Sequence, residues 1–479
     1  MVLKKIAKDS AIYGFSDFIS KVLAFFIFPV IAAVFSPETY GVLELILTAT
    51  GFLGLAMQCG LNNAVQRFYW DKEIESSTRP AIVTTGFVTQ FSFGLLALVL
   101  GMLALPFVLP MTCEAGWPIT WIALVGALVV MVFTQWTQYV LDVLRLHFAR
   151  LRFVALALSS RLSVLLASLV SVVWLGYGLD GLLATQALVL TLFLPIGLVM
   201  IRKDFNLKSL NLEWSRKLVG FGYPFVFAGL AYWLFGSMDR WMLASMSSIE
   251  EVGIYSVSFR FSSIVFFVSV AFGQAWSPLA IKIRTDHPEN YRKIYGQVLL
   301  LLLFVMLIVG GGVALFSGET IGLVMPKEYH ASAIPLSILC FGVILQATQQ
   351  VTAIGISIEK KTFLLARLAW LTAFVNLAGN YLLVPRYGAT GAACATLISY
   401  AVLTFSYLFF TQRLHPLQME WRRLMALLLM GCAVATVSIY HMSIEINSFI
   451  LLIKISFAIT CILVGWRLLP LKRIEVSTP

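Results

Sequence analysis

The sequence has few charged residues for its length. Only 12% of its 479 residues are Asp, Glu, Lys or Arg, and 60% are hydrophobic, whereas a soluble domain carries roughly 25% charged residues. No stretch between its apolar segments is long enough to fold as a separate soluble domain. This composition excludes an ordinary soluble protein. The net charge of +11 then indicates basic loops beside a membrane, and we expect no nucleic-acid partner.

The sequence also lacks the motifs of common enzymes and metalloproteins. It has no GxxxxGK phosphate loop, no HExxH zinc motif and no recognisable catalytic triad, and none of its six cysteines belongs to a CxxC pair. These absences disfavour ATP hydrolysis, metal chemistry and a disulfide framework. We therefore expect a protein that is not an enzyme and that uses no cofactor and no metal.

Long apolar segments fill most of the chain. A segment of about 20 apolar residues crosses a hydrocarbon core of about 30 Å, and about fourteen such segments follow one another. We place them at 10–35, 40–60, 81–109, 117–141, 154–175, 180–200, 219–246, 253–276, 294–316, 333–357, 363–384, 388–410, 424–441 and 447–469. The predicted fold class is an all-α membrane protein.

The basic residues predict the orientation of these spans. With the N-terminus in the cytoplasm, 26 of the 34 Lys and Arg residues fall in cytoplasmic segments, and only Lys327 and Arg386 fall in outer loops. Basic loops favour the cytoplasmic side, so both termini are predicted to be cytoplasmic. The outer loops are short, which disfavours a membrane polymerase or glycosyltransferase with a large outer catalytic loop.

The two halves of the sequence contain similar segments. Residues 36–41 (SPETYG) match residues 248–253 (SIEEVG), and Gly178-Leu-Asp-Gly181 matches Gly388-Ala-Thr-Gly391. Six spans per repeat place the two copies in parallel orientation. The predicted organisation is an N-terminal six-helix lobe at 1–206, an inter-lobe linker that can form an amphipathic helix at 207–218, a C-terminal six-helix lobe at 219–412, and two extra helices in 413–479.

Ionisable residues inside the spans are candidate functional residues, because such residues are costly in hydrocarbon. The spans contain six cations, including Lys454 outside the repeat, and two clear anions. A surplus of Arg and Lys suits an anionic group such as phosphate. The predicted substrate-binding cations are Lys21, Arg161, Arg240, Arg260 and Arg367, and the predicted ion-coupling residues are Asp17 and Asp239. Snorkelling to headgroups and structural ion pairing remain the alternatives.

Uncharged polar residues also occur within the spans. They can hydrogen-bond sugar hydroxyls, or they can join helices at about 1 kcal/mol or less each. For any single residue the second interpretation is favoured. The candidates for a polar cavity are Asn62, Gln66, Gln135, Gln346, Asn376 and Asn380.

The segment from Asn376 to Tyr400 (NLAGNYLLVPRYGATGAACATLISY) resembles a signature of bacterial polysaccharide-biosynthesis flippases. Residues 36–41, the Asp239-Arg240 pair and the segment from Gly253 to Arg260 fit the same family, and the resemblance covers almost the whole chain. The family belongs to the multidrug/oligosaccharidyl-lipid/polysaccharide (MOP) superfamily. The resemblance implies two six-helix lobes in a V around a central, often cationic cavity.

The resemblance also implies a function. Such a flippase translocates an undecaprenyl-pyrophosphate-linked oligosaccharide, an O-antigen or exopolysaccharide repeat unit, from the cytoplasmic to the periplasmic leaflet of the bacterial inner membrane. Alternating access coupled to an ion or proton gradient is expected, in a monomer. Expected partners are the lipid-linked glycan, membrane lipid, a polysaccharide polymerase and a chain-length regulator. The alternatives are a MATE-type multidrug or cation exporter, a lipid II flippase, and a membrane polymerase or glycosyltransferase.

Overall fold

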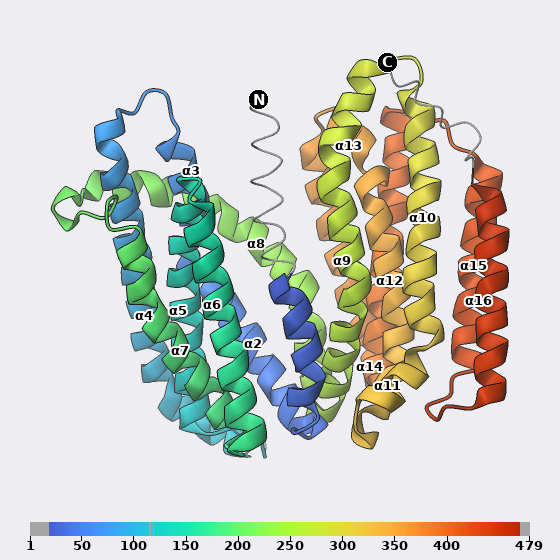
Figure 1. The fold of residues 1–479 in the computed structure, drawn as a ribbon, viewed down its shortest axis with the longest axis horizontal. Coiled ribbons are helices and arrows are strands. Elements are labelled where there is room, and N and C mark those ends of the chain that lie inside the picture. Colours follow the sequence, from blue (N-terminus) through green and yellow to red (C-terminus); the bar gives the residue numbers. More distant parts are fainter. Residues whose placement is uncertain (1–18, 115, 118, 470–479) are drawn as a thin grey trace. The chain divides into compact units, whose positions relative to one another are not determined.

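A computed structural model describes residues 19–114, 116–117 and 119–469, and every regular element in them is a helix (Figure 1). Twelve helices are long and apolar enough to cross a membrane. One of them, α14 (Thr362–Leu414), is interrupted at Gly388 and forms two membrane segments. Together with the shorter apolar helix Ile19–Ala32, the described residues contain fourteen candidate membrane segments. This confirms the predicted all-α membrane protein.

The chain divides into two compact units, Met1–Ser237 and Met238–Pro479. Unit 1 contains the helix Ile19–Ala32. Its other elements, in chain order, are α2 (Pro37–Gln58), α3 (Leu61–Tyr69), η1 (Ser76–Thr78), α4 (Arg79–Glu114), α5 (Trp121–Leu146), α6 (Arg150–Leu169), η2 (Val170–Trp174), α7 (Gly178–Met200), η3 (Leu207–Ser209) and α8 (Leu212–Met246).

Unit 2 begins within the last turns of α8. Its remaining elements are α9 (Ile249–Asp286), α10 (Tyr291–Leu315), α11 (Ser317–Val324), η4 (Lys327–Ser332), α12 (Ala333–Thr352), α13 (Ile354–Ile358), α14, α15 (Trp421–Tyr440) and α16 (Ser448–Leu468). The segment 207–218, predicted to link the lobes, contains η3 and the first turns of α8, which then continues as a helix across the boundary between the units.

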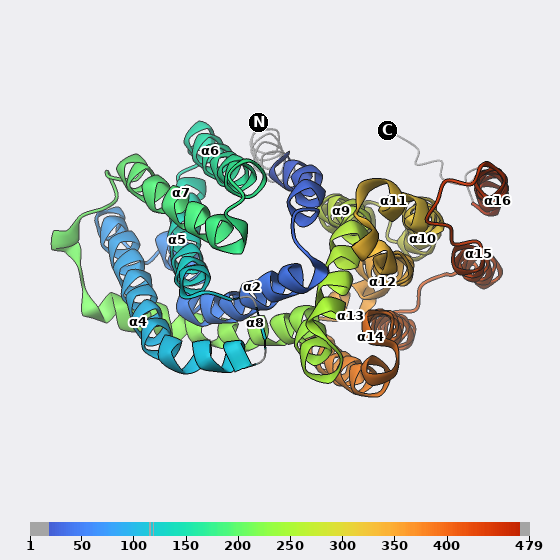
Figure 2. The ribbon, with the colours of Figure 1, turned by 90° about the horizontal axis from the view of Figure 1, so that it is seen from below.

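Each unit is organised around one central helix. In unit 1, α5 packs against α2, α4, α6 and α7, and in unit 2, α12 packs against α9, α10, α14 and α15 (Figure 2). Buried apolar side chains such as Val132 and Leu144 on α5, and Leu336 and Ala347 on α12, form the core at these contacts. Burying such side chains stabilises each by about 1.5–3 kcal/mol relative to water. The helices that occupy the fourth and tenth membrane segments therefore have equivalent positions in the two units.

The repeated motifs have equivalent local structure. Ser36 and Ser248 are N-caps of α2 and α9, and each side-chain hydroxyl accepts a hydrogen bond from the backbone N–H three residues later, at 3.2 Å. Gly178 and Gly388 both have positive φ, at 60° and 51°. Such values are easily adopted by glycine and strain other residues. The repeated residues thus mark helix starts and chain reversals in both units.

Gly388 turns α14 back on itself. At its φ of 51° and ψ of −131° the helix is broken. The two arms then lie side by side, since a Cβ on Gly379 would be 3.1 Å from the Cβ of Ala395, and Leu368 and Leu403 belong to one small buried cluster. This hairpin positions the polar residues described next.

Candidate functional site

A buried carboxylate, Asp239, lies at the centre of a polar cluster in unit 2. It is on α8, about 10 Å from the end of that helix at 1.5 Å per residue, and it is only 3% exposed. Three side-chain hydrogen bonds reach its two oxygens. Tyr255 Oη on α9 donates at 2.6 Å, Thr396 Oγ1 donates at 3.0 Å, and Asn380 Nδ2 donates at 2.7 Å.

The α14 hairpin explains why two of these donors meet. Asn380 lies eight residues before Gly388 and Thr396 eight residues after it, so the reversal brings them to similar depths on adjacent arms. Asn376 lies one turn before Asn380, and its Oδ1 accepts from Asn380 Nδ2 at 3.2 Å. The structure therefore brings together three residues that the sequence marked separately, Asp239, Asn376 and Asn380.

The hydrogen-bonding capacity of this cluster is not exhausted. Asn376 Nδ2 and Asn380 Oδ1 are buried without a hydrogen-bond partner among the described residues. Every group that donates to Asp239 is neutral, and no group of three or more His, Cys, Asp or Glu residues suited to a metal ion occurs in the described part of the chain. A carboxylate whose hydrogen-bond donors are neutral can accept a proton or a hard monovalent cation, since hard cations prefer oxygen ligands. The adjacent Arg240 is a positive charge that acts on this carboxylate.

Arg240 follows Asp239 and is 5% exposed. Its Nε donates to Ser256 Oγ at 3.2 Å, and its guanidinium lies 4.8 Å from the ring centroid of Phe259 and 5.7 Å from that of Tyr255. The side chain thus packs between α8 and α9 with both a hydrogen bond and cation–π contacts. In this structure it offers little surface to a substrate.

The other predicted cations are distributed over both units. Lys21 is exposed on the Ile19–Ala32 helix and Arg161 is half-buried on α6, both in unit 1. In unit 2, Arg260 is half-buried on α9, and Arg367 is exposed on α14 with its guanidinium 4.4 Å from the ring centroid of Phe363. Asp17 lies outside the described residues.

Unit 1 has its own buried carboxylate, which the sequence analysis did not identify. Asp142 near the end of α5 accepts from Asn62 Nδ2 at 2.5 Å and from Gln138 Nε2 at 3.1 Å, and it lies 3.6 Å from Arg145 Nη1. Asn62 therefore joins α3 to α5. Asp142 was missed because the predicted span ended at residue 141, whereas α5 continues to Leu146.

The remaining polar candidates are half-buried. Gln66 is on α3, Gln135 on α5 and Gln346 on α12. The Gln135 amide packs against Gly54 on α2, where an added Cβ would be 2.9 Å from Gln135 Nε2. The structure does not join these three residues into one site.

Lys454 is also explained by a partner that the sequence analysis missed. Its Nζ lies 2.6 Å and 2.8 Å from the two carboxylate oxygens of Glu319 on α11, and the lysine is fully buried. Glu319 was assigned to an outer loop, so the count of two buried anions was too low. Lys454 is therefore a paired structural charge that fixes α16 to α11.

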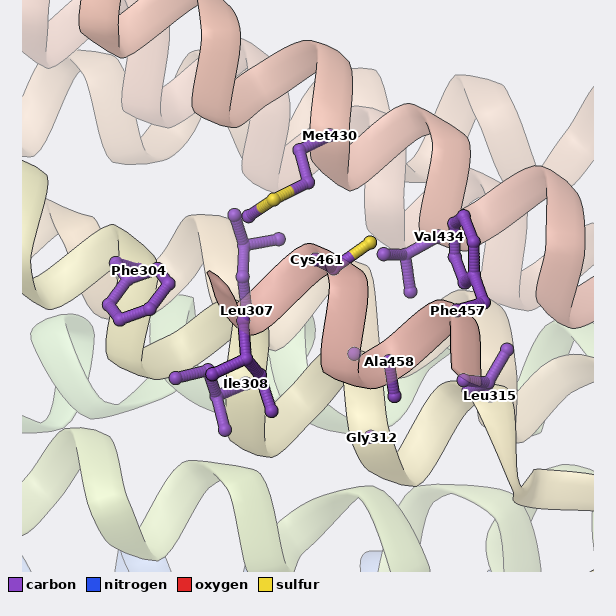
Figure 3. A pocket seen from close by; sticks show the side chains of 12 residues that line it. Phe304, Leu307, Ile308, Gly312, Leu315, Met430, Val434, Phe457, Ala458 and Cys461 are labelled. Carbon is purple, nitrogen blue, oxygen red and sulfur yellow. The ribbon is translucent and has the colours of Figure 1, made fainter. Parts of the chain in front are cut away.

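A small apolar cavity lies between α10, α15 and α16 (Figure 3). Its volume is about 40 Å³, and Phe304, Leu307, Met430, Phe457 and Cys461 are among its lining residues. A space of this size holds little more than one small molecule of water size, so we assign no ligand to it.

Comparison with known proteins identifies related families. The model of the family described as "Polysaccharide biosynthesis protein" matches residues 6–284, more than half of the chain, and the MatE family model matches residues 224–382. A curated relative, the probable low-salt glycan biosynthesis flippase Agl15 of Haloferax volcanii, is 22% identical over 228 residues. That match covers 47% of this chain and 48% of the relative, so the chain spans about half the length of this relative.

Solved structures with the same fold include two membrane transporters. Lipid II flippase MurJ in an inward closed conformation matches with a TM-score of 0.72 and 16% identity, over 95% of this chain and 97% of that one. A multidrug resistance MATE family transporter of the MOP superfamily, in an inward-facing conformation, matches with a TM-score of 0.62 and 15% identity, over 81% and 93% of the two chains. At these identities the likeness establishes the fold.

Proposed function

The chain belongs to the polysaccharide biosynthesis protein family, and we propose that it is a flippase for a lipid-linked oligosaccharide. The proposed substrate is an undecaprenyl-pyrophosphate-linked repeat unit of an O-antigen or exopolysaccharide. The chain would move it from the cytoplasmic to the periplasmic leaflet, with both of its termini in the cytoplasm. Family membership, the name of the Haloferax relative and the two transporter folds support a transporter over an enzyme.

One observation carries the proposal that transport is ion-coupled. Asp239 is a carboxylate enclosed within a membrane segment, and among the described residues its hydrogen-bond donors are neutral groups from α9 and both arms of α14. An ionisable residue kept at such a position is expensive, and such residues usually belong to ion or proton pathways. Protonation or cation binding would neutralise Asp239 without separating it from a charged hydrogen-bond partner.

The same geometry suggests how neutralisation could affect the helices. The three donors to Asp239 come from α9 and from the two arms of α14, so the ionised carboxylate draws these helices together. Hydrogen bonds to a charged acceptor are roughly twice as strong as neutral ones. Loss of the charge would weaken this contact and favour a different arrangement of α8, α9 and α14. The predicted cations Lys21, Arg161, Arg240, Arg260 and Arg367 remain the proposed contacts for the pyrophosphate, and Asp17 remains a second proposed coupling residue.

The test uses the full-length protein in proteoliposomes that contain a fluorescent polyprenyl-pyrophosphate-linked oligosaccharide. Access of a membrane-impermeant quencher reports flipping, with and without an imposed pH or Na⁺ gradient. We expect Asp239→Asn to remove the acceleration caused by the gradient, because the amide cannot change its charge. The variant should still fold, since its oxygen can accept from Tyr255 and Thr396, and Asn380 can rotate its unpartnered Oδ1 toward the new amide N–H.

The matched control is Glu44→Gln, the same chemical change at a buried carboxylate on α2 that accepts from Tyr40 Oη at 3.0 Å. It should leave the gradient response intact. If Asp239→Asn responds to the gradient as strongly as the wild type does, the coupling assignment is wrong, although flipping itself would remain established.

The MatE match covers Asp239 and therefore keeps a cation or drug exporter as the second candidate. The same proteoliposomes loaded with a fluorescent cationic dye distinguish the two functions. We expect gradient-dependent movement of the glycan lipid and none of the dye. Dye export without glycan flipping would refute the flippase proposal. Flipping of lipid II in preference to the oligosaccharide lipid would assign the chain to wall synthesis instead.

A further inference from the structure

A large mixed cavity lies within unit 2, at the end where α9 and α13 meet near the top of Figure 1. Its volume is about 680 Å³, within the range of about 300–1,000 Å³ that is usual for ligand pockets. The walls come from the last turns of α9, the C-terminal end of α12, α13, and Tyr295 on α10. None of the cations or carboxylates discussed above lines it.

One wall of this cavity is held in place by two buried aromatic side chains. Trp276 is 3% exposed, and its indole N–H donates to the Gln350 carbonyl at 3.1 Å. Tyr295 Oη donates to the Ala280 carbonyl at 2.5 Å, and the two rings pack edge to face with centroids 5.2 Å apart. The polar atoms of both rings are bonded within the protein, and at 3% and 1% exposure Trp276 and Tyr295 support the wall and leave little ring surface for a ligand.

Two cations line the same cavity. Arg284 on α9 and Lys360 after α13 are both exposed, and no Asp or Glu is among the lining residues. The structure records no salt bridge for either cation with any residue in its described part. Arg284 and Lys360 make the charged part of the cavity lining positive, which favours an anionic ligand.

Glu359, the acidic residue next to Lys360 in the sequence, has a different partner. The carboxylate of Glu359 lies 3.1 Å from His415 Nδ1, and the other ring nitrogen of His415 is 2.9 Å from Tyr291 Oη. Lys360 itself has a left-handed backbone with φ of 55°, and its N–H bonds to the Ser357 carbonyl at 3.1 Å as α13 ends. The chain reversal thus separates Lys360 from its acidic neighbour and directs the two residues to different surroundings.

Uncharged hydrogen-bonding groups complete the lining. The Gln350 side chain is exposed and packs against Gly273, where an added Cβ would be 3.0 Å from the amide carbon. Ser277, Thr285 and Ser357 add hydroxyl groups. Cations, an amide and hydroxyls together match a phosphate group attached to a hydroxylated headgroup.

We propose that this cavity binds the phosphate-bearing headgroup of a membrane lipid, with Arg284 and Lys360 as its phosphate contacts. The cavity lies at the end of unit 2 that carries Lys282, Arg292, Lys293 and Lys361, which is the predicted cytoplasmic end. A headgroup bound there would be at the leaflet from which the proposed substrate departs. The role as a loading site for that substrate rests on the proposed function, whereas the binding itself does not.

The test compares two double variants of the full-length protein in lipid nanodiscs. Arg284→Gln/Lys360→Gln removes the two cations of the cavity. Lys282→Gln/Lys361→Gln removes two neighbouring cations that do not line it, so the variants have equal net charge. Binding of a short-chain polyprenyl-pyrophosphate sugar and of short-chain phosphatidylglycerol is measured for each, together with thermal stability as the check on folding.

We expect the cavity variant to bind the pyrophosphate sugar about 100-fold more weakly, as the loss of two charge-assisted contacts at about tenfold each. The control should stay within about twofold of the wild type. If both variants bind the pyrophosphate sugar equally weakly, the effect is one of net charge and the proposal is overturned. Normal binding in the cavity variant would also overturn it. A cavity-dependent site that takes phosphatidylglycerol and excludes the sugar lipid would refute the loading role.

The flipping assay separates this proposal from the proposed function. Suppose that the wild type binds the headgroup but flips no glycan lipid, and that the cavity variant alone loses headgroup binding. The binding site is then supported and the proposed function is refuted. If the cavity variant flips and binds normally, the function stands and the binding site fails. The loading role is supported if the cavity variant flips more slowly, if a higher glycan-lipid content restores its flipping rate, and if its response to the gradient is unchanged.

Discussion

The buried ion pair between Glu319 and Lys454 offers a quantitative test of how the two C-terminal helices are fixed. Lys454 on α16 is fully buried and Glu319 on α11 is 9% exposed, and Nζ contacts both carboxylate oxygens at 2.6 Å and 2.8 Å. At an effective dielectric constant of about 20, a separation of this size gives an attraction of roughly 6 kcal/mol. Removing both charges from water consumes much of that gain.

The two single substitutions should therefore differ from the double substitution. Breaking a buried pair by removing one partner costs about 3–5 kcal/mol, because the other charge is left without compensation. Glu319→Gln should lie at the upper end of this range, since it leaves the fully buried ammonium. Lys454→Met should lie at the lower end, because the partly exposed Glu319 can be hydrated. Lys454→Met/Glu319→Leu leaves no charge and should be within about 1 kcal/mol of the wild type.

The assay is a double-mutant cycle on the full-length protein in detergent micelles, with the stability of unit 2 followed by thermal unfolding. The control is Lys327→Met, which removes an exposed lysine at the same end of unit 2. The structure records no salt bridge for Lys327 in its described part. The expected order of stability is the wild type close to the double variant, then Lys454→Met, then Glu319→Gln. If the double variant is destabilised by the sum of the two single effects, the residues are not coupled and the reasoning fails.

Two further predictions concern the residues of the internal repeat. Gly388→Ala should destabilise the fold more than Gly178→Ala, as measured by thermal unfolding. Both glycines have positive φ, but only at Gly388 would the new Cβ meet another group, Glu251 Oε2 at 2.5 Å. Equal effects would show that φ alone determines the cost, at about 1–2 kcal/mol. Ser36→Ala and Ser248→Ala should each cost about 1 kcal/mol through loss of the N-cap, measured against Ser36→Thr and Ser248→Thr, and unequal costs would contradict the equivalence of the two helix starts.

The sequence was sufficient to predict the membrane segments, because each is a long apolar run bounded by polar residues. The reversal within α14 was also predictable, since Pro385 and Gly388 separate two apolar runs that are each long enough to cross the membrane. Helix ends were harder to place. Asp142 lies in the last turns of α5, and hydropathy does not mark where a helix stops.

Pairing between distant residues was beyond the sequence analysis, but depth offers a signal that could have found one pair. Lys454 lies in the second turn of α16, close to its N-terminal end, and Glu319 lies in the first turn of α11, just after the C-terminal end of α10. A buried lysine requires a partner at its own depth, and Glu319 satisfies this condition. No comparable rule links Asp239 to Asn380 and Thr396, because their contact depends on the direction in which Gly388 turns the chain.

The partners of a buried charge distinguish its structural and functional roles. Lys454 is matched by an opposite charge, so any change in its ionisation would leave Glu319 uncompensated at a cost of several kcal/mol. Asp239 is hydrogen-bonded by neutral groups, so a proton or cation can neutralise it without leaving a hydrogen-bonded counter-charge behind. Arg284 and Lys360 represent a third case, exposed cations that share a cavity with no acidic lining residue. A surplus of cations in the sequence therefore indicates a ligand site only where those cations have no acidic partner. In unit 2 this criterion favours the cavity lined by Arg284 and Lys360 over Lys454, which is paired with Glu319.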